Sequence, residues 1–174
     1  CYLNDMTPAE LTKAPAQDIQ EYQGLLKRSG LILEDFDIPN PNADHWAWNS
    51  IKVLTEYGLV AGGMNNDYLL NLESNEEHLT TLLINLMVKA APQKYSLELD
   101  SRIRAFRNEN ILTGETAAEI LLKAADIPYT QGNAFQTAKD KGLFPAEVLT
   151  RINPDKPVTL DCVYAMTVYL IDKL

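Results

Sequence analysis

The residues best suited to bind a ligand gather in one short stretch that is rich in aromatic and polar side chains. It contains Asp44, His45, Trp46 and Trp48. Indole rings can stack on sugars, and a histidine can hydrogen-bond to their hydroxyl groups. The alternative is structural: Trp46 anchors the core, Trp48 covers a seam, and His45 fixes the turn before a short helix.

Catalytic and metal chemistry find little support in the spacing of the other polar residues. A Cys–His pair would need Cys162 beside His45 or His78, and no spacing brings them together. A calcium loop that includes Asn153 fails because Cys162 would occupy its twelfth ligand position. We therefore expect a protein that is not an enzyme, with no catalytic residues, no cofactor and no metal.

The two cysteines predict different things. Cys162 lies among apolar residues at helical spacing, which predicts a buried and inert thiol. Cys1 stands where a bacterial lipoprotein carries its lipid after signal-peptide cleavage, so it is a lipidation candidate. The alternative for Cys1 is a boundary left by trimming the chain.

Composition narrows the class of protein. Of 174 residues, 46% are hydrophobic, which fits a folded domain, and the formal net charge is −9. Nucleic acid is therefore excluded as an expected partner, because phosphate binding needs a clustered basic face. No apolar run is long enough to span a bilayer, so we expect no transmembrane segment.

Helical patterns dominate the chain and predict an all-α fold. Apolar residues recur at helical spacing in three long segments, around Leu79–Met87, Ala117–Ala124 and Val163–Ile171. Shorter helices are expected at Trp48–Tyr57, Ser101–Glu109 and Phe135–Lys141. The residues that follow them, Gly58, Asn110 and Gly142, are expected to cap these short helices.

These helices form a repeat in which a short helix, a cap, an apolar pair and a loop precede a longer helix. Gly58 stands 17 residues before Asn75, and Gly142 stands 17 residues before Thr159. Asn75 and Thr159 suit the N-cap of the following helix. The middle unit lacks the loop, because Thr113 follows its apolar pair directly.

The repeat resembles S-layer homology domains, the modules that attach proteins to bacterial cell walls. The first unit carries the resemblance in Asp37-Ile38-Pro39, Asp44-His45-Trp46-Ala47-Trp48, Gly58-Leu59-Val60 and Gly62. The third unit carries it in Ile152-Asn153-Pro154-Asp155-Lys156-Pro157-Val158-Thr159. The middle unit keeps only its helices and Thr113.

The resemblance implies three helix-loop-helix units in a pseudo-threefold bundle. We place the units at residues 35–92, 93–128 and 129–174, with residues 1–34 as an N-terminal helical extension of one compact domain. In the family, grooves between units bind cell-wall polysaccharide, and a T-R-A-E motif opens each long helix. The arginine of that motif faces the anionic ligand beside the helix N-terminus.

This chain departs from the family at each motif arginine. Glu76, Gly114 and Leu160 stand in the arginine positions of the three units, and Pro8 stands there in a similar N-terminal stretch. Losing these charge-assisted contacts, each of about 1.5–3 kcal/mol, should strongly weaken binding of an anionic polymer. The fold is therefore expected to be retained while the family's usual ligand is not.

Two functions of different class follow for a non-catalytic module of the bacterial cell surface or envelope. One is attachment to peptidoglycan or a secondary wall polysaccharide; the other is a degenerate scaffold that mediates protein–protein interaction. An accessory domain of a larger surface hydrolase is a third. The ligand-groove candidates are Asp44, His45, Trp46, Trp48, Gly62, Asn75, Glu76, Thr113, Asn153 and Thr159.

Overall fold

The computed structural model describes residues 42–174, which belong to one compact unit, Pro41–Leu174. This part of the chain is all-α, as predicted, and its only β pairing consists of isolated bridges. Its helices are α4 (Trp48–Glu56), α5 (Glu76–Ala90), α6 (Leu97–Arg104), α7 (Gly114–Ala124), α8 (Ala134–Asp140), α9 (Ala146–Leu149) and α10 (Leu160–Lys173). The predicted N-terminal extension (residues 1–34), Cys1 and Asp37-Ile38-Pro39 lie outside the described residues.

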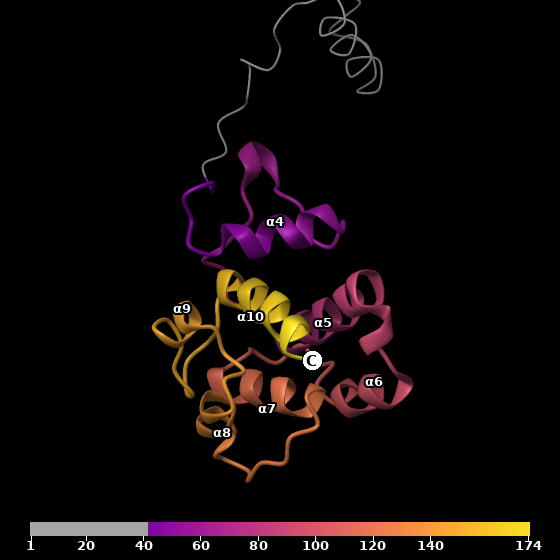
Figure 1. Cartoon of the computed structure of the whole chain (residues 1–174). Helices are drawn as coiled ribbons and strands as arrows, with labels where there is room; N and C mark the ends of the chain where they lie inside the picture. Colours follow the sequence, from indigo (N-terminus) through magenta and orange to yellow (C-terminus); the bar gives the residue numbers. More distant parts are fainter. Residues whose placement is uncertain (1–41) are drawn as a thin grey trace, which may run out of the picture. The chain divides into compact units, whose positions relative to one another are not determined.

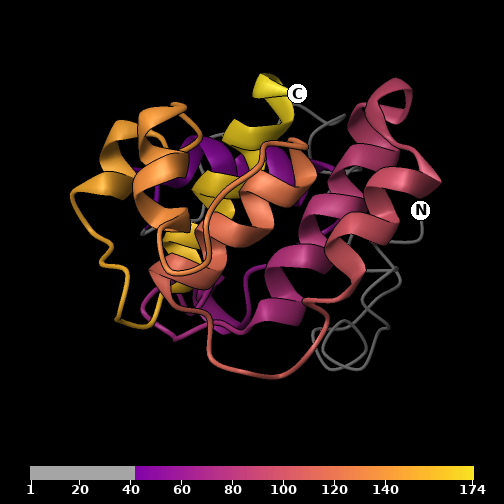
Figure 2. The ribbon, with the colours of Figure 1, turned by 90° about the horizontal axis from the view of Figure 1, so that it is seen from below.

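The three long helices form the core, and their predicted apolar stripes are confirmed. In α5, Leu79, Leu83 and Met87 are fully buried, because the helical repeat places them on one face. α10 packs against both α4 and α5, and α7 packs against α8 and α6 (Figure 1). In Figure 2, α5 and α6 lie on one side of this unit, and α8 and α9 lie on the opposite side. None of the described helices is long and apolar enough to cross a membrane.

Glycine ends two of the short helices, as predicted. Gly58 has φ +71° and Gly142 has φ +69°, values that glycine adopts without a Cβ penalty. The Leu59 N–H then donates to the Leu54 carbonyl at 2.9 Å, and the Leu143 N–H to the Ala138 carbonyl at 3.0 Å. Each turn thereby satisfies a carbonyl at a helix end.

The predicted short helix of the middle unit was wrong in its bounds. It was expected at Ser101–Glu109 with an Asn110 cap, but α6 runs from Leu97 to Arg104. The side chain of Ser96 accepts the Leu99 N–H at 3.1 Å and so starts the helix earlier. A local serine cap therefore decides where this helix begins.

The segments before the three long helices hydrogen-bond to one another in a closed cycle, which we call the ring. The Ser74 N–H donates to the Val158 carbonyl at 2.9 Å, and the Val158 N–H donates to the Leu112 carbonyl at 2.8 Å. The Leu112 N–H donates to the Ser74 carbonyl at 2.9 Å, which closes the cycle. All three residues are buried, so the ring satisfies backbone groups that water does not reach.

Carbonyl groups of the ring segments also accept a hydrogen bond from the first N–H group of each long helix. Glu76 donates to the Asn110 carbonyl at 3.0 Å, Gly114 to the Lys156 carbonyl at 3.3 Å, and Leu160 to the Leu72 carbonyl at 3.0 Å. These N–H groups have no partner inside their own helices. The middle unit thus supplies an equivalent segment without the long loop of the other two.

Candidate binding site

The three positions that would carry the family's arginine point into the protein. Glu76 and Leu160 are only 8% and 6% exposed. Gly114 is buried as well, and a Cβ atom there would lie 2.2 Å from the backbone oxygen of Asn153. No side chain fits at residue 114 without moving that backbone. These positions therefore offer no exposed charge to a ligand.

Of these three residues, only Glu76 has a polar side chain, and its hydrogen bonding is incomplete. Its Oε2 atom is buried and has no hydrogen-bond partner in the described part of the chain. The residue stands at the first position of α5, where the positive helix end favours a carboxylate. The helix end thus compensates only part of the desolvation cost.

Three of the predicted groove residues, His45, Trp46 and Thr159, meet around Asp161. Trp46 Nε1 donates to Asp161 Oδ2 at 3.2 Å, and His45 Nε2 lies 3.9 Å from the same oxygen. The hydroxyl of Thr159 donates to Asp161 Oδ1. Asp161 is 7% exposed, so these donors offset the cost of burying its charge.

Thr159 does not cap α10 as expected. It occupies the N-cap position, but its side chain makes no capping hydrogen bond. The Cys162 N–H instead donates to Asp161 Oδ1 at 2.8 Å. Because the hydroxyl of Thr159 is turned to Asp161, the carboxylate takes over part of the capping role.

Arg151 adds a cation to this cluster. Its guanidinium carbon lies 4.2 Å from the centroid of the Trp46 ring, within the range of a cation–π contact. Its Nη1 donates to the Glu147 carbonyl at 2.7 Å and to Thr150 Oγ1 at 3.1 Å. His45, Trp46, Arg151, Thr159 and Asp161 are called the Trp46–Arg151 site below.

A groove of about 230 Å³ adjoins this site between α4, α9 and α10. Its aromatic rims are Trp46 and Tyr169. Its polar lining consists of Asn49, Ser50, Glu147 and Asp172. Aromatic rings with hydrogen-bonding groups around them can hold a polar molecule that has an apolar face.

Two further predicted residues, Trp48 and Gly62, both meet Tyr68. The Trp48 and Tyr68 rings lie 5.9 Å apart, edge to face. A Cβ atom on Gly62 would lie 2.9 Å from Tyr68 Cε2. Trp48 is half-buried and packs against the core, which agrees with the seam-covering alternative. Asp44 is exposed at the start of this segment.

The remaining predicted residues hold the long helices in place. Asn75 Oδ1 accepts the His78 N–H at 2.8 Å, which confirms the expected N-cap. Thr113 Oγ1 accepts the Thr116 N–H at 3.2 Å. The Asn153 backbone fills the space beside Gly114. The ten predicted groove residues thus fall in several places rather than in one groove.

His78 is half-buried, and Cys162 is buried. The Nδ1 of His78 lies 3.3 Å from Ser74 Oγ, and burial lowers the pKa of this histidine. Cys162 is 1% exposed. Burial and the nearby Asp161 raise the pKa of this thiol to about 12, so it stays protonated and unreactive near neutral pH.

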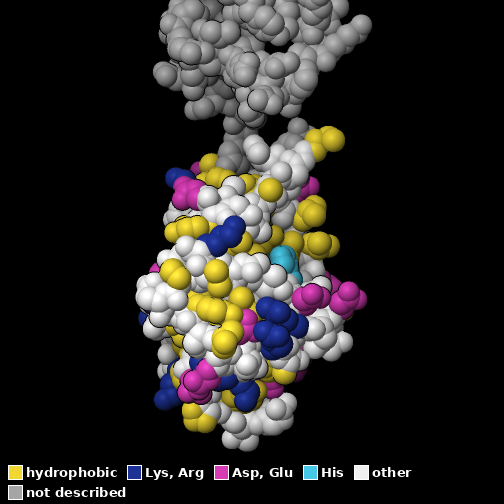
Figure 3. Space-filling model, turned by 90° about the vertical axis from the view of Figure 1, so that its right-hand side faces the viewer, with side chains coloured by type: hydrophobic (Ala, Val, Ile, Leu, Met, Phe, Trp, Pro, Cys, Tyr) yellow, Lys and Arg dark blue, Asp and Glu magenta, His cyan; other side chains and the backbone are white. Residues whose placement is uncertain are grey.

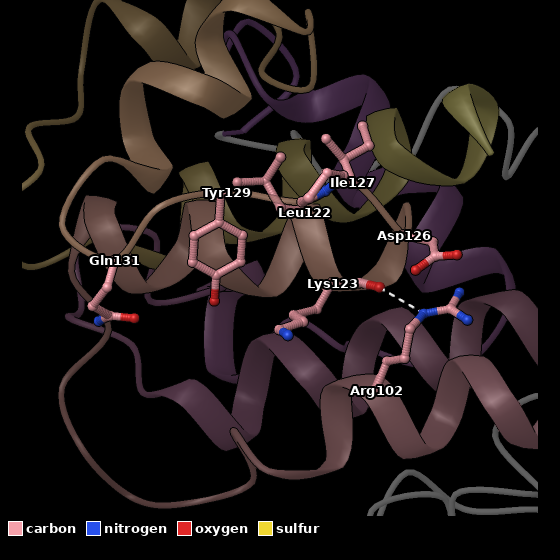
Figure 4. A pocket seen from close by; sticks show the side chains of 8 residues that line it. Arg102, Leu122, Lys123, Asp126, Ile127, Tyr129 and Gln131 are labelled. Carbon is pink, nitrogen blue, oxygen red and sulfur yellow. Dashed lines mark hydrogen bonds between the residues drawn. The ribbon is translucent and has the colours of Figure 1, made fainter.

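A second hollow, of about 510 Å³, lies at the C-terminal end of α7 and was not predicted. We call it the α7-end pocket (Figure 4). Its lining consists of Arg102, Leu122, Lys123, Asp126, Ile127, Pro128, Tyr129 and Gln131. Asp126 has φ +57°, and the Ile127 N–H reaches back to the Leu122 carbonyl at 2.9 Å. This turn is the same helix-ending turn that glycine makes elsewhere, here built on aspartate.

Charge is mixed over the surface that Figure 3 shows. Basic, acidic and hydrophobic side chains are interspersed there. Among residues 42–174, no group of three or more His, Cys, Asp or Glu side chains could hold a metal ion.

Comparison with known proteins adds no relative. No family model matches the chain. No curated protein matches it significantly. The resemblance to S-layer homology domains therefore remains a prediction from the residues themselves.

Proposed function

We propose that the protein is a non-catalytic module of the bacterial cell envelope that attaches to a cell-wall polymer through the Trp46–Arg151 site. The observation that carries this proposal is the guanidinium of Arg151 held over the indole of Trp46. It supplies a fixed cation beside an aromatic ring, although all three motif positions lack arginine.

The ring supports the S-layer-homology-like architecture on which the proposal depends. Three segments, each directly preceding a long helix, exchange hydrogen bonds in one cyclic order. Such an exchange is what three repeated units around a common axis would produce. The middle segment takes part although its unit has lost most of the family's sequence.

Arg151 is the group of the site that can pair with an anion. The Asp161 carboxylate is turned inward and accepts hydrogen bonds from Trp46, Thr159 and the Cys162 N–H, while Glu147 and Asp172 line the adjoining groove. Arg151 is exposed. Its Nη1 donates to nearby oxygens of the protein, and the other N–H groups of the guanidinium remain available for a ligand. An anionic substituent of a wall polymer could pair with it there.

One such contact should bind more weakly than three. A charge-assisted hydrogen bond contributes about 1.5–3 kcal/mol. The family's motif places one arginine in each unit, whereas this chain offers one guanidinium at one junction. We therefore expect wall binding that is weak and sensitive to salt.

The test is retention of the full chain on purified cell-wall sacculi at low salt, for wild type, Arg151→Gln and Arg107→Gln. Arg107 is an exposed arginine outside the site and serves as the matched control. We expect Arg151→Gln to lower retention about tenfold and Arg107→Gln to leave it within twofold. A wild-type chain that is not retained on the sacculi would contradict the proposal.

Exposed apolar residues in the segments that form the ring favour scaffolding as the second candidate function. Ile111 is 57% exposed and Leu72 is 55% exposed, and Pro157, which is bridged to Thr113, is exposed as well. Apolar side chains that cluster at a surface often mark a protein contact. Here the partner would be another envelope protein.

Site-specific photocrosslinking in cells tests this second function. A crosslinker placed at residue 111 should give a discrete adduct, and one placed at the exposed Lys139 should not. Equal labelling from both positions, or none from residue 111, would contradict scaffolding through the ring.

A further inference from the structure

The α7-end pocket presents charges of both signs around an apolar floor. Lys123 and Arg102 supply cations, and Asp126 supplies a carboxylate. Ile127 and Pro128 supply the accessible apolar lining. Its volume of about 510 Å³ is within the range of small-molecule sites. It shares no residue with the Trp46–Arg151 site.

We propose that this pocket binds a small zwitterion with an aliphatic side chain, of which a free aliphatic amino acid is the simplest. The carboxylate of the ligand pairs with Lys123, and its ammonium group pairs with Asp126. Its side chain covers Ile127 and Pro128.

Lys123 is available for this role because Arg102 already hydrogen-bonds to the carbonyl groups at the end of α7. Arg102 Nε donates to the Lys123 carbonyl at 2.8 Å, and Nη2 donates to the Ala124 carbonyl at 3.2 Å. These carbonyls carry the negative end of the helix dipole. The Lys123 ammonium lies instead 5.7 Å from the centroid of the Tyr129 ring and forms no salt bridge within residues 42–174.

Asp126 offers an exposed carboxylate on a backbone that is fixed at the end of α7. Its left-handed φ of +57° and the hydrogen bonds that close the turn hold residue 126 at the end of α7. The side chain is exposed and forms no salt bridge in the described part. In the view of Figure 4, it lies on the same side of the pocket as Arg102, with Lys123 between them and Tyr129.

The rest of the lining suits an amino acid better than a simple anion. Ile127 is half-buried and Pro128 is exposed, so an aliphatic side chain placed on them would remove apolar surface from water. Tyr129 adds a hydroxyl to the lining that can donate to a carboxylate, whereas the Gln131 side chain already hydrogen-bonds to Glu119. A simple anion would pair only with the cations, and the Asp126 carboxylate would repel it.

The experiment is an NMR titration of the isotope-labelled full chain with four ligands: leucine, leucinamide, N-acetylleucine and glycine. Leucinamide lacks the carboxylate, N-acetylleucine lacks the ammonium group, and glycine lacks the side chain. We expect leucine to shift the resonances of residues 122–131 and to bind about fivefold more tightly than each of the others.

Two variants assign each charge to its partner. Lys123→Gln should abolish the preference for leucine over leucinamide and keep the preference over N-acetylleucine. Asp126→Asn should do the reverse, and asparagine tolerates the left-handed backbone there. Lys139→Gln, on the exposed face of α8, should change neither. Equal binding of all four ligands, or no shift at residues 122–131, would overturn the proposal.

Discussion

The backbone of Asn153 occupies the space in which residue 114 would need a side chain. A Cβ atom at Gly114 would stand 2.2 Å from the Asn153 oxygen and 3.1 Å from Pro154 Cα. Both neighbours are backbone atoms of a segment that the ring holds in place, so neither can move cheaply. The loss of arginine at residue 114 is thus built into the packing of the chain.

Gly114→Ala should destabilise the protein by about 1–3 kcal/mol or more, because overpacking against backbone forces the segment to shift. Chemical denaturation measures the effect. Gly63→Ala is the control, because its nearest neighbour would be a single backbone oxygen at 3.3 Å. Equal losses in the two variants would contradict a specific clash at residue 114.

Glu115 holds the start of α8 from the first turn of α7. Its two carboxylate oxygens accept the N–H groups of Ala134 and Phe135, each at 2.9 Å. The N-cap residue of α8 itself makes no side-chain capping bond. Glu115→Ala should therefore cost about 1–2 kcal/mol of stability, measured by denaturation, and should speed hydrogen exchange at residues 134 and 135.

Glu109→Ala serves as the control for that experiment, because Glu109 is an exposed acidic residue. Unchanged exchange at residues 134 and 135 in Glu115→Ala would contradict the capping role of Glu115.

Local signals predicted the helices, and long-range contacts account for what was missed. The apolar stripe of α5 and the glycine that ends α4 can be identified from a few neighbouring residues, because helical period and backbone conformation act over one turn. α6 was placed wrongly because Ser96 caps it from a position before the expected start. That serine was a local signal that sequence analysis missed, as was the left-handed Asp126 that ends α7.

The binding residues were harder to predict for a physical reason. Trp46 and Asp161 are 115 residues apart in the chain but share a hydrogen bond. Arg151 reaches Trp46 from the turn after α9. No periodicity or spacing records such pairs, since they depend on how the helices pack. Sequence analysis therefore found His45, Trp46 and Thr159 but not the Asp161 and Arg151 side chains that join them.

Glu119 should make the stability of the fold depend on pH. Burial raises the pKa of this carboxyl, and the nearby Glu115 and Glu76 raise it further. The folded state then binds the proton more tightly than the unfolded state, so stability falls as pH rises from the ordinary carboxyl pKa through the raised value. Glu119→Gln should flatten this slope in denaturation curves measured from pH 4 to pH 7.

The control for the pH series is Glu109→Gln, which removes one negative charge from an exposed position. It should leave the slope as in wild type. If both variants flatten the slope equally, overall charge rather than buried Glu119 is responsible.

Glu76→Met should stabilise the protein, which is an unusual result for a change in a buried residue. The Oε2 atom of Glu76 is buried without a partner among the described residues, and a buried unsatisfied polar group costs about 1–3 kcal/mol. Methionine has a similar length, no charge and enough flexibility to fill the site. The loss of a favourable charge at the helix N-terminus, about 0.3–1 kcal/mol, works against the gain but is smaller.

Glu77→Met on the next, exposed position of α5 loses the same helix-end interaction without relieving any burial, so denaturation should show it slightly destabilised. A loss of stability in Glu76→Met as large as that in Glu77→Met would show that the Glu76 carboxylate is better satisfied than its surroundings indicate.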